Sequence, residues 1–161
     1  MLLALFLLAF AAAPVCSLAS TDSIQDADPP QSGYLSNHNM NPATVGSSAF
    51  GLLWKNAYGP LEKWYASPLV YTPTGKSQLV FLASSANIIR TVDAVNGTLL
   101  NSRLVQPPFL ESDIGCTDIP DQIGITGTPV LDPSTDTVYF FSKGYKNAAS
   151  SGGVANGMPN H

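Results

Sequence analysis

Residues 64–105 read WYASPLVYTPTGKSQLVFLASSANIIRTVDAVNGTLLNSRLV, and this stretch indicates the fold class. It holds four short runs of aliphatic, aromatic and β-branched residues, each closed by a turn signal, as is typical of consecutive strands. Asn96-Gly97 lies between the last two runs, and Asn-Gly between strand-like segments is the strongest short hairpin signal. Four antiparallel strands of this length form one blade of a β-propeller or one wall of a sandwich. We expect these strands over residues 65–71, 78–84, 87–93 and 98–105.

Strand-like segments also lie on both sides of this stretch. Upstream, residues 47–54 resemble a strand that ends in Trp54. Downstream, residues 124–132 and 136–143 predict a strand pair that turns at Asp132-Pro133-Ser134. The connection over residues 106–123 contains three prolines and four carboxylates and is predicted to be a long loop. Residues 20–46 are polar, carry no apolar period and predict an irregular lead.

The downstream pair repeats the start of the central stretch. The sequence ASPLV at residues 66–70 aligns with GTPVL at residues 127–131, an offset of 61 residues, and a turn and an apolar strand follow each copy. The second copy lacks the last two strands of the first, and residues 47–54 correspond to the last strand of a preceding copy. Self-similarity at a fixed offset indicates a repeat architecture. We therefore infer one complete four-stranded unit flanked by two partial ones.

The composition narrows the class of protein. The chain has 161 residues, a length that suits one domain, with 13 Gly, 13 Pro and only 11% charged residues. This balance is typical of a secreted β protein rich in turns and not of a disordered one. The net charge is −4, and the seven Lys and Arg residues are scattered. Since phosphate binding needs a clustered basic surface, no nucleic-acid partner is expected.

The first residues indicate the compartment. Residues 1–18 are almost wholly apolar, and Ser17-Leu18-Ala19 supplies small residues at the positions that a signal peptidase inspects. We expect a secretory signal peptide over residues 1–19, cleavage after Ala19, and a secreted, extracellular product that does not contact membranes after cleavage. The alternative is an uncleaved membrane anchor, because the apolar run is nearly long enough to span a bilayer.

Two residues are candidates for covalent modification. Asn96-Gly97-Thr98 is the one Asn-X-Ser/Thr sequence whose middle residue is not proline, and a hairpin tip would expose Asn96 to a glycosyltransferase. The alternative is that Asn-Gly is present for turn geometry alone, and both can hold. Cys116 is the sole cysteine once Cys16 leaves with the signal peptide. An odd cysteine in a secreted protein predicts a disulfide to a missing partner or a free thiol.

These residues resemble a known blade repeat. The order Ser-Pro-aliphatic pair, turn, VFLAS at residues 80–84, then VDAVNG at residues 92–97 resembles the repeat of the quinoprotein β-propellers, whose usual ending is Ala-x-Asp-x-x-Thr-Gly-x-x-x-Trp. Asp93 and Gly97 match this ending, and Trp54 resembles the docking tryptophan of a preceding blade. Departures from the ending are Thr91 for Ala, Asn96 for Thr and Asn101 for Trp. Residues 112–120 with 124–132 are similar to a stretch of large secreted, mostly fungal proteins with this propeller.

The resemblance implies an all-β fold of antiparallel four-stranded blades over residues 47–161. It also implies an incomplete ring, because a propeller typically has at least four blades. We therefore expect the N-terminal fragment of a longer protein. Family dehydrogenases hold pyrroloquinoline quinone and calcium with a Glu, an Asn and an Asp, and often stack a vicinal disulfide on the quinone. The sequence has no Cys-Cys pair and no carboxylate that we can match, so quinone and calcium are expected only if the longer protein is a dehydrogenase, and no catalytic residue is assigned.

Three further groups of residues have both a functional and a plainer interpretation. The carboxylates of the 106–123 loop offer oxygen ligands for calcium, but a solvated loop is the favoured interpretation. His38 has no second histidine or nucleophile nearby and is expected on the surface, and His161 is the last residue. Aromatic side chains could form a sugar-stacking platform or simply pack in the core. The carboxylates are Glu111, Asp113, Asp118 and Asp121; the aromatics are Trp54, Trp64, Tyr65, Tyr139, Phe140 and Phe141.

Three hypotheses for function follow. The first is a secreted binding or scaffold propeller without catalysis in this segment, whose partner would be a carbohydrate or the remainder of the propeller. The second is part of a quinone-dependent oxidoreductase that acts on alcohols or sugars, which depends on fold analogy alone. The third is a truncated product with no function of its own.

Overall fold

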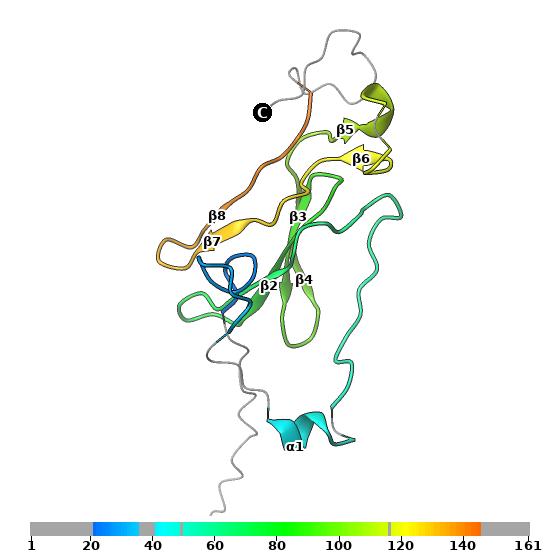
Figure 1. The fold of residues 1–161 in the computed structure, drawn as a ribbon. Coiled ribbons are helices and arrows are strands. Elements are labelled where there is room, and N and C mark those ends of the chain that lie inside the picture. Colours follow the sequence, from blue (N-terminus) through cyan, green and yellow to red (C-terminus); the bar gives the residue numbers. More distant parts are fainter. Residues whose placement is uncertain (1–20, 36–40, 49, 116, 146–161) are drawn as a thin grey trace, which may run out of the picture.

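The computed structural model describes residues 21–35, 41–48, 50–115 and 117–145 (Figure 1). The expected signal peptide, His38, Cys116 and His161 lie outside these ranges. Most regular structure in the described residues is antiparallel β-sheet with little helix, which confirms the all-β class. Within these ranges, no helix has the length and apolar character needed to cross a bilayer.

A four-stranded antiparallel sheet forms the centre of the molecule. Its strands follow one another in the order β1-β2-β3-β4, as the sequence predicts, although each is shorter than expected. The first loses most, because Pro68 has no N–H to give to a ladder and the strand begins only after it. On the outer edge of β1, Asp22 and Val70 exchange two backbone hydrogen bonds of 2.8 Å. The strands are β1 (Leu69–Tyr71), β2 (Leu79–Ala83), β3 (Ile88–Asp93) and β4 (Leu99–Leu104).

The turn between β3 and β4 lies at Asn96-Gly97, as predicted, but it is longer than a two-residue hairpin. The Asp93 carboxylate accepts hydrogen bonds from the backbone N–H groups of Val95 and Asn96, at 2.9 and 3.0 Å. Gly97 then takes a φ of 75°, a left-handed conformation in which a side chain is strained. Its N–H donates to the Asp93 carbonyl at 2.9 Å. The turn is therefore organised by Asp93 and closed by Gly97.

A second hairpin, β7 (Val130–Asp132) and β8 (Thr137–Tyr139), repeats the pairing of β1 and β2. Leu69 lies opposite Phe81 in the first hairpin, and Val130, the residue aligned with Leu69, lies opposite Tyr139 in the second. The aligned copies also contact each other, because the Ser67 N–H donates to Thr128 Oγ1 at 3.0 Å across 61 positions. The structure thus contains the repeated strand pair that the sequence offset indicates.

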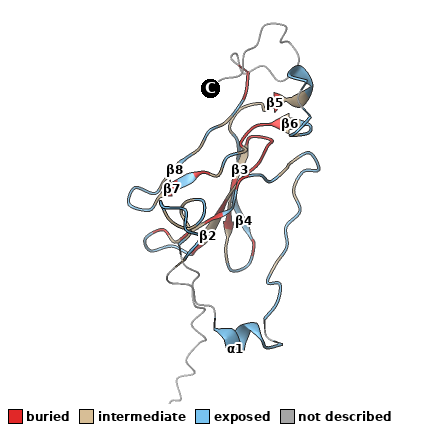
Figure 2. Cartoon of the chain, in the orientation of Figure 1, coloured by how far each residue is buried: buried red, intermediate tan, exposed pale blue. Residues whose placement is uncertain are grey.

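The hydrophobic core lies between the central sheet and this second hairpin. Strand alternation places Phe81 and Ala83 on one face of β2, and both are buried there against Leu131 of β7 and Ile125 of the preceding segment. Figure 2 shows buried positions in the central sheet, whereas the helix α1 (Pro42–Val45) is exposed. Burial of such side chains contributes about 1.5–3 kcal/mol each relative to exposure. The core is completed by Ala66, Leu69 and Tyr71 and is flanked by the half-buried Leu79, Ile89, Val138 and Phe140.

A buried turn joins the two halves of this packing. The Ser84–Asn87 turn connects β2 to β3, and Asn87 adopts a φ of 57°. Its side chain donates from Nδ2 to the Lys143 carbonyl at 2.6 Å and accepts from the Ser142 hydroxyl at 2.8 Å. Gly124 approaches so closely that a Cβ there would lie 2.4 Å from Asn87 Oδ1. A single buried amide therefore binds the central sheet to the segment that follows β8.

Two expectations about the connections are wrong. Residues 106–123 are not a plain loop, since β5 (Phe109–Leu110) pairs with β6 (Gln122–Ile123) around the 3₁₀-helix η1 (Glu111–Asp113). Strands of two residues are too short for a periodic signal. They are stabilised by a second cluster in which Phe109 and Ile123 bury against Tyr145, whose hydroxyl accepts a hydrogen bond of 3.0 Å from the Leu110 N–H.

Residues 47–54 were expected to form a strand, and the described residues of this segment contain none. They form an extended arm that leaves the short helix α1 (Pro42–Val45), itself unexpected in the lead, and returns to the sheet (Figure 1). A strand needs a neighbour to complete its ladder, and no described strand runs beside the arm. Leu52 and Leu53 are accordingly 81% and 82% exposed.

Loss of the buried Asn87 side chain should lower the free energy of unfolding. Asn87→Ala removes both side-chain bonds, leaves the Lys143 carbonyl without this donor and forces alanine into a left-handed conformation. We expect the free energy of unfolding in urea to fall by about 2–4 kcal/mol. The control Asn101→Ala, at an exposed position on β4, should change it by less than about 0.5 kcal/mol. Equal losses in the two variants would contradict this role.

Candidate functional site

An aromatic cleft of about 650 Å³ opens on the face of the central sheet opposite the core. Its floor includes Val80 and Leu82, which alternate along β2 with the core residues Phe81 and Ala83. This volume lies in the range of small-molecule sites. The remaining lining residues come from the end of the arm and the approach to β1, and they are Trp54, Asn56, Tyr58, Trp64, Tyr65, Ala66, Ser67 and Pro68.

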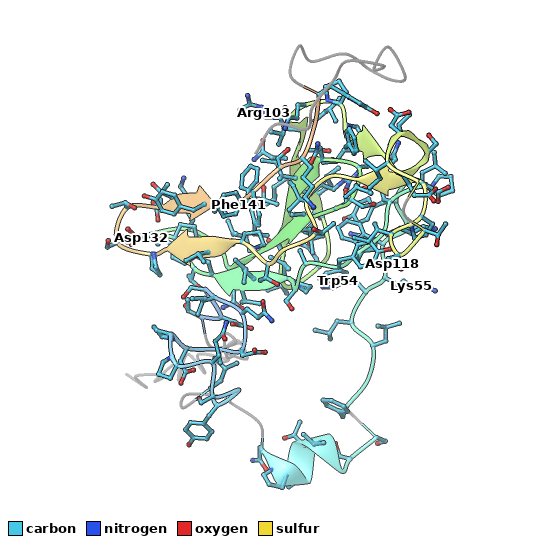
Figure 3. All side chains as sticks on the ribbon, turned by 45° about the horizontal axis from the view of Figure 1, so that its top comes forward. Trp54, Lys55, Arg103, Asp118, Asp132 and Phe141 are labelled. Atoms are coloured by element: carbon cyan, nitrogen blue, oxygen red, sulfur yellow. The ribbon has the colours of Figure 1, made fainter. Side chains whose placement is uncertain are left out.

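The arm is held at the cleft by the β3–β4 turn. The Trp54 indole donates from Nε1 to the Ala94 carbonyl at 3.0 Å, and the Asn56 amide donates to the Gly97 carbonyl at 2.7 Å. The Trp54 ring lies directly on Gly97, where a Cβ would be 2.7 Å from the ring atom Cδ2. Figure 3 shows Trp54 where the arm meets the sheet. The glycine predicted for turn geometry thus also makes room for an indole.

Tyr58 lies against both a cation and another aromatic ring. The Arg90 guanidinium carbon is 4.2 Å from the centre of the Tyr58 ring, within cation–π distance. The Tyr58 ring also contacts Trp64, with the ring centres 5.6 Å apart and the ring planes at 55°. The Asn56 amide also donates to the Tyr58 hydroxyl at 3.2 Å. Tyr58 therefore has defined neighbours along its face and at its hydroxyl.

A buried ion pair lies next to Tyr58. Arg90 of β3 makes a two-pronged contact with Glu62, Nη1 to Oε2 at 2.5 Å and Nη2 to Oε1 at 2.7 Å, and the side chains are only 9% and 5% exposed. Burial by itself raises the pKa of the Glu62 carboxyl. Hydrogen bonds from Arg90, Ser84 and Gly59 and the charge of Arg90 together lower it by more, so the net pKa lies below the ordinary value. Glu62 is therefore ionised, and the pair carries no net charge.

The cleft itself is uncharged. None of its lining residues, all within the described part of the chain, is Asp, Glu, Lys, Arg or His. The nearest buried cation, Arg90, is neutralised by Glu62 and covered by Tyr58. Polar groups are supplied by an amide, hydroxyls and backbone atoms. Such a surface can contact a neutral ligand that has apolar faces and hydrogen-bonding edges.

The six aromatics considered for a sugar-stacking platform do not share one site. Trp54, Trp64 and Tyr65 line the aromatic cleft, whereas Tyr139, Phe140 and Phe141 line a separate pocket of about 330 Å³ beside Val130 of β7. The core separates the two groups, because the second hairpin packs on the other face of the central sheet. Figure 3 shows Phe141, which follows β8, apart from Trp54. Tyr58, which lies between the strand-like segments expected at residues 47–54 and 65–71, was not singled out from the sequence.

Two of the four acidic residues of the 106–123 segment, Asp113 and Asp121, contact other side chains. Asp113 accepts a short hydrogen bond from the Tyr145 hydroxyl, whose pKa is raised by burial and by that bond. Asp121 lies 3.8 Å from the Lys63 ammonium at the surface. Among the described residues, no group of three or more His, Cys, Asp or Glu side chains is arranged to hold a metal ion. The calcium hypothesis for Glu111, Asp113, Asp118 and Asp121 thus gains no support.

Asn96 lies at the tip of the β3–β4 turn. Its side chain is exposed, and its Oδ1 accepts a hydrogen bond of 2.8 Å from the Thr98 N–H. The neighbouring Gly97 is buried under Trp54. The position is open to solvent, and glycosylation of Asn96 stays a prediction.

Two glycines with similar backbone angles can separate backbone strain from the Trp54 contact. Gly97 and Gly75 have φ values of 75° and 71°, but a Cβ at Gly75 would meet nothing within 4 Å. We expect Gly75→Ala to lower the free energy of unfolding by about 1–2 kcal/mol. Gly97→Ala should cost about 1–3 kcal/mol more, because it displaces the indole, and should shift tryptophan fluorescence to longer wavelength. Equal costs and an unchanged spectrum would show that Trp54 does not pack there.

Comparison with known proteins gives no match to this chain. No family model matches the sequence, and neither a curated protein nor a solved structure does. The resemblance to quinoprotein β-propellers therefore stays a prediction, and the residues of the aromatic cleft are the basis for inferring a function.

Proposed function

We propose that the chain is a secreted, non-catalytic binding protein built of propeller-type blades, whose aromatic cleft binds a neutral saccharide. One observation carries the proposal. Four aromatic side chains from a short segment gather around one uncharged cleft on the free face of the sheet: Trp54, Tyr58, Trp64 and Tyr65.

The solvent exposure of two of these rings supports a role in ligand binding in addition to packing. Trp64 and Tyr65 are 44% and 43% exposed while lining a concave site. Large apolar surfaces left in contact with water in a cleft are typical of binding sites. A sugar ring has an apolar C–H face that can lie on an aromatic face, and hydroxyls around its edge that need hydrogen-bond partners. The tyrosine hydroxyls, Ser67 and nearby backbone groups can supply such partners.

The absence of charge in the lining supports a neutral sugar over an acidic one. Carboxylate or sulfate groups on a saccharide are bound by Arg or Lys, most strongly in a two-pronged geometry. The guanidinium of Arg90, which lies against the cleft residue Tyr58, already makes that contact with Glu62. Because no cation is among the lining residues, desolvating an acidic sugar in the cleft would cost more free energy than desolvating a neutral one.

A second candidate is scaffolding, in which the same face packs on another blade. One observation favours it. The β7–β8 hairpin packs on the opposite face of the central sheet and repeats the β1–β2 register, as stacked blades would. In that case the occupant of the cleft would be apolar side chains of a protein, and soluble oligosaccharides would not compete for it.

The binding proposal is tested with purified, secreted chain and a panel of hexasaccharides. We expect saturable binding by titration calorimetry to a neutral member among cellohexaose, laminarihexaose, mannohexaose and chitohexaose, and none to hexagalacturonate. Trp64→Ala should weaken binding about five- to thirtyfold, because an aromatic contact at a binding site contributes on the order of 1–2 kcal/mol.

The matched control is Tyr139→Ala, which removes an aromatic side chain of 60% exposure outside the cleft and should leave affinity unchanged. Binding that survives Trp64→Ala, or a panel without any neutral ligand, would refute the saccharide proposal. In the second case, titration with other protein segments would become the appropriate test of scaffolding.

A further inference from the structure

We propose that the buried Glu62–Arg90 ion pair is a positioning device for the aromatic cleft, an inference that rests on the proposed binding function. The pair holds the Tyr58 ring, and through it the Trp64 ring, in the orientation that a ligand contacts. Glu62 and Arg90 would not touch the ligand. They would set the geometry of the residues that do.

The position of Arg90 in the sheet is the first step. Arg90 lies directly opposite Leu82 in the β2–β3 ladder, and directly opposite residues share one face of an antiparallel pair. Leu82 lines the aromatic cleft, so Arg90 projects from the same face. Its guanidinium lies 4.2 Å from the Tyr58 ring centre. The cleft face of β3 therefore carries the guanidinium that the Tyr58 ring contacts.

Glu62 fixes the guanidinium and the backbone next to Tyr58. Both carboxylate oxygens accept from Arg90, and Oε1 also accepts from the Gly59 N–H at 3.2 Å. The ion pair thus restrains Tyr58 at two points. Arg90 contacts the face of its ring, and Glu62 accepts a hydrogen bond from the backbone of the next residue, Gly59. Tyr58 in turn contacts Trp64 with a ring separation of 5.6 Å. A continuous chain of contacts runs from a buried charge to the cleft wall.

These contacts at position 90 require an arginine side chain. A planar guanidinium can bind a carboxylate with two parallel bonds and still offer a flat face to an aromatic ring, whereas a lysine ammonium cannot do both. The nearby Lys63–Asp121 pair offers a contrast. Its charges are 3.8 Å apart and the side chains are 39% and 46% exposed, so solvent screens the interaction. Lys63 neighbours Glu62 in sequence, which makes this pair a matched control.

The test compares Arg90→Lys with Lys63→Gln at a temperature where both are folded, with binding normalised to the active fraction. We expect Arg90→Lys to reduce the near-ultraviolet circular dichroism of the Tyr58–Trp64 pair. It should also weaken binding of the neutral hexasaccharide that the wild type binds by about fivefold or more. Lys63→Gln should keep both the spectrum and the affinity. Should Arg90→Lys fail to fold, Glu62→Gln, which keeps an oxygen acceptor and removes the charge, replaces it with the same expectation.

The outcomes separate positioning from stability and from the proposed function. A variant with a lower unfolding midpoint but a wild-type spectrum and affinity would overturn the positioning role. If the wild type binds no hexasaccharide, the saccharide proposal fails, and the near-ultraviolet spectrum alone still decides whether the ion pair orders the two rings. In the Tyr58→Leu background, Arg90→Lys should have no further effect on affinity, and an undiminished effect would contradict transmission through Tyr58.

Discussion

The buried turn between β2 and β3 is the constraint on which the rest of the structure depends. Asn87, at a φ of 57°, bonds through its side chain to the Lys143 carbonyl and the Ser142 hydroxyl. The backbone of the same turn bonds to Lys63 and Ile125. The turn residues Ser84–Asn87 are all buried, so their polar groups depend on these partners and not on water. Both sides of the central sheet are thereby held to one short turn.

This arrangement gives the two faces of the sheet different roles. On one face, the β7–β8 hairpin covers Phe81 and Ala83 and completes the core. On the other, the described residues between α1 and β1 contribute aromatic side chains and no strand, which leaves a cleft instead of a second packed layer. The Lys63 contacts with Ser85 anchor the end of this segment, and Trp54 on Gly97 anchors its start. The cleft is therefore bounded by two fixed points on the sheet.

The strands of the central sheet could be predicted because their signals are local. Apolar runs closed by Pro73-Thr74-Gly75 and by Asn96-Gly97 specify where the chain extends and where it turns. Residues 47–54 show the limit of the same reasoning, since an apolar extended segment becomes a strand only beside a partner. Trp54, which the sequence singles out, lines the cleft, but the sequence groups the aromatics by type alone. Only the packing of the second hairpin separates Tyr139 and Phe141 from Trp54. Tyr58 was missed because its importance lies in a contact with Arg90, which is remote in sequence.

By itself, the sequence determined the all-β class, the order of the four central strands, the position of the β3–β4 turn and the repeated strand pair. These depend on side-chain alternation, turn residues and similarity at a fixed offset, which are properties of neighbouring residues. Only the tertiary structure decided which face became core, which aromatics share a cleft, and that Arg90 pairs with Glu62. The physical reason is that burial and charge pairing depend on which segments meet in space. Glu62 and Arg90 lie 28 positions apart and become partners only when the segment that follows the arm packs against β3.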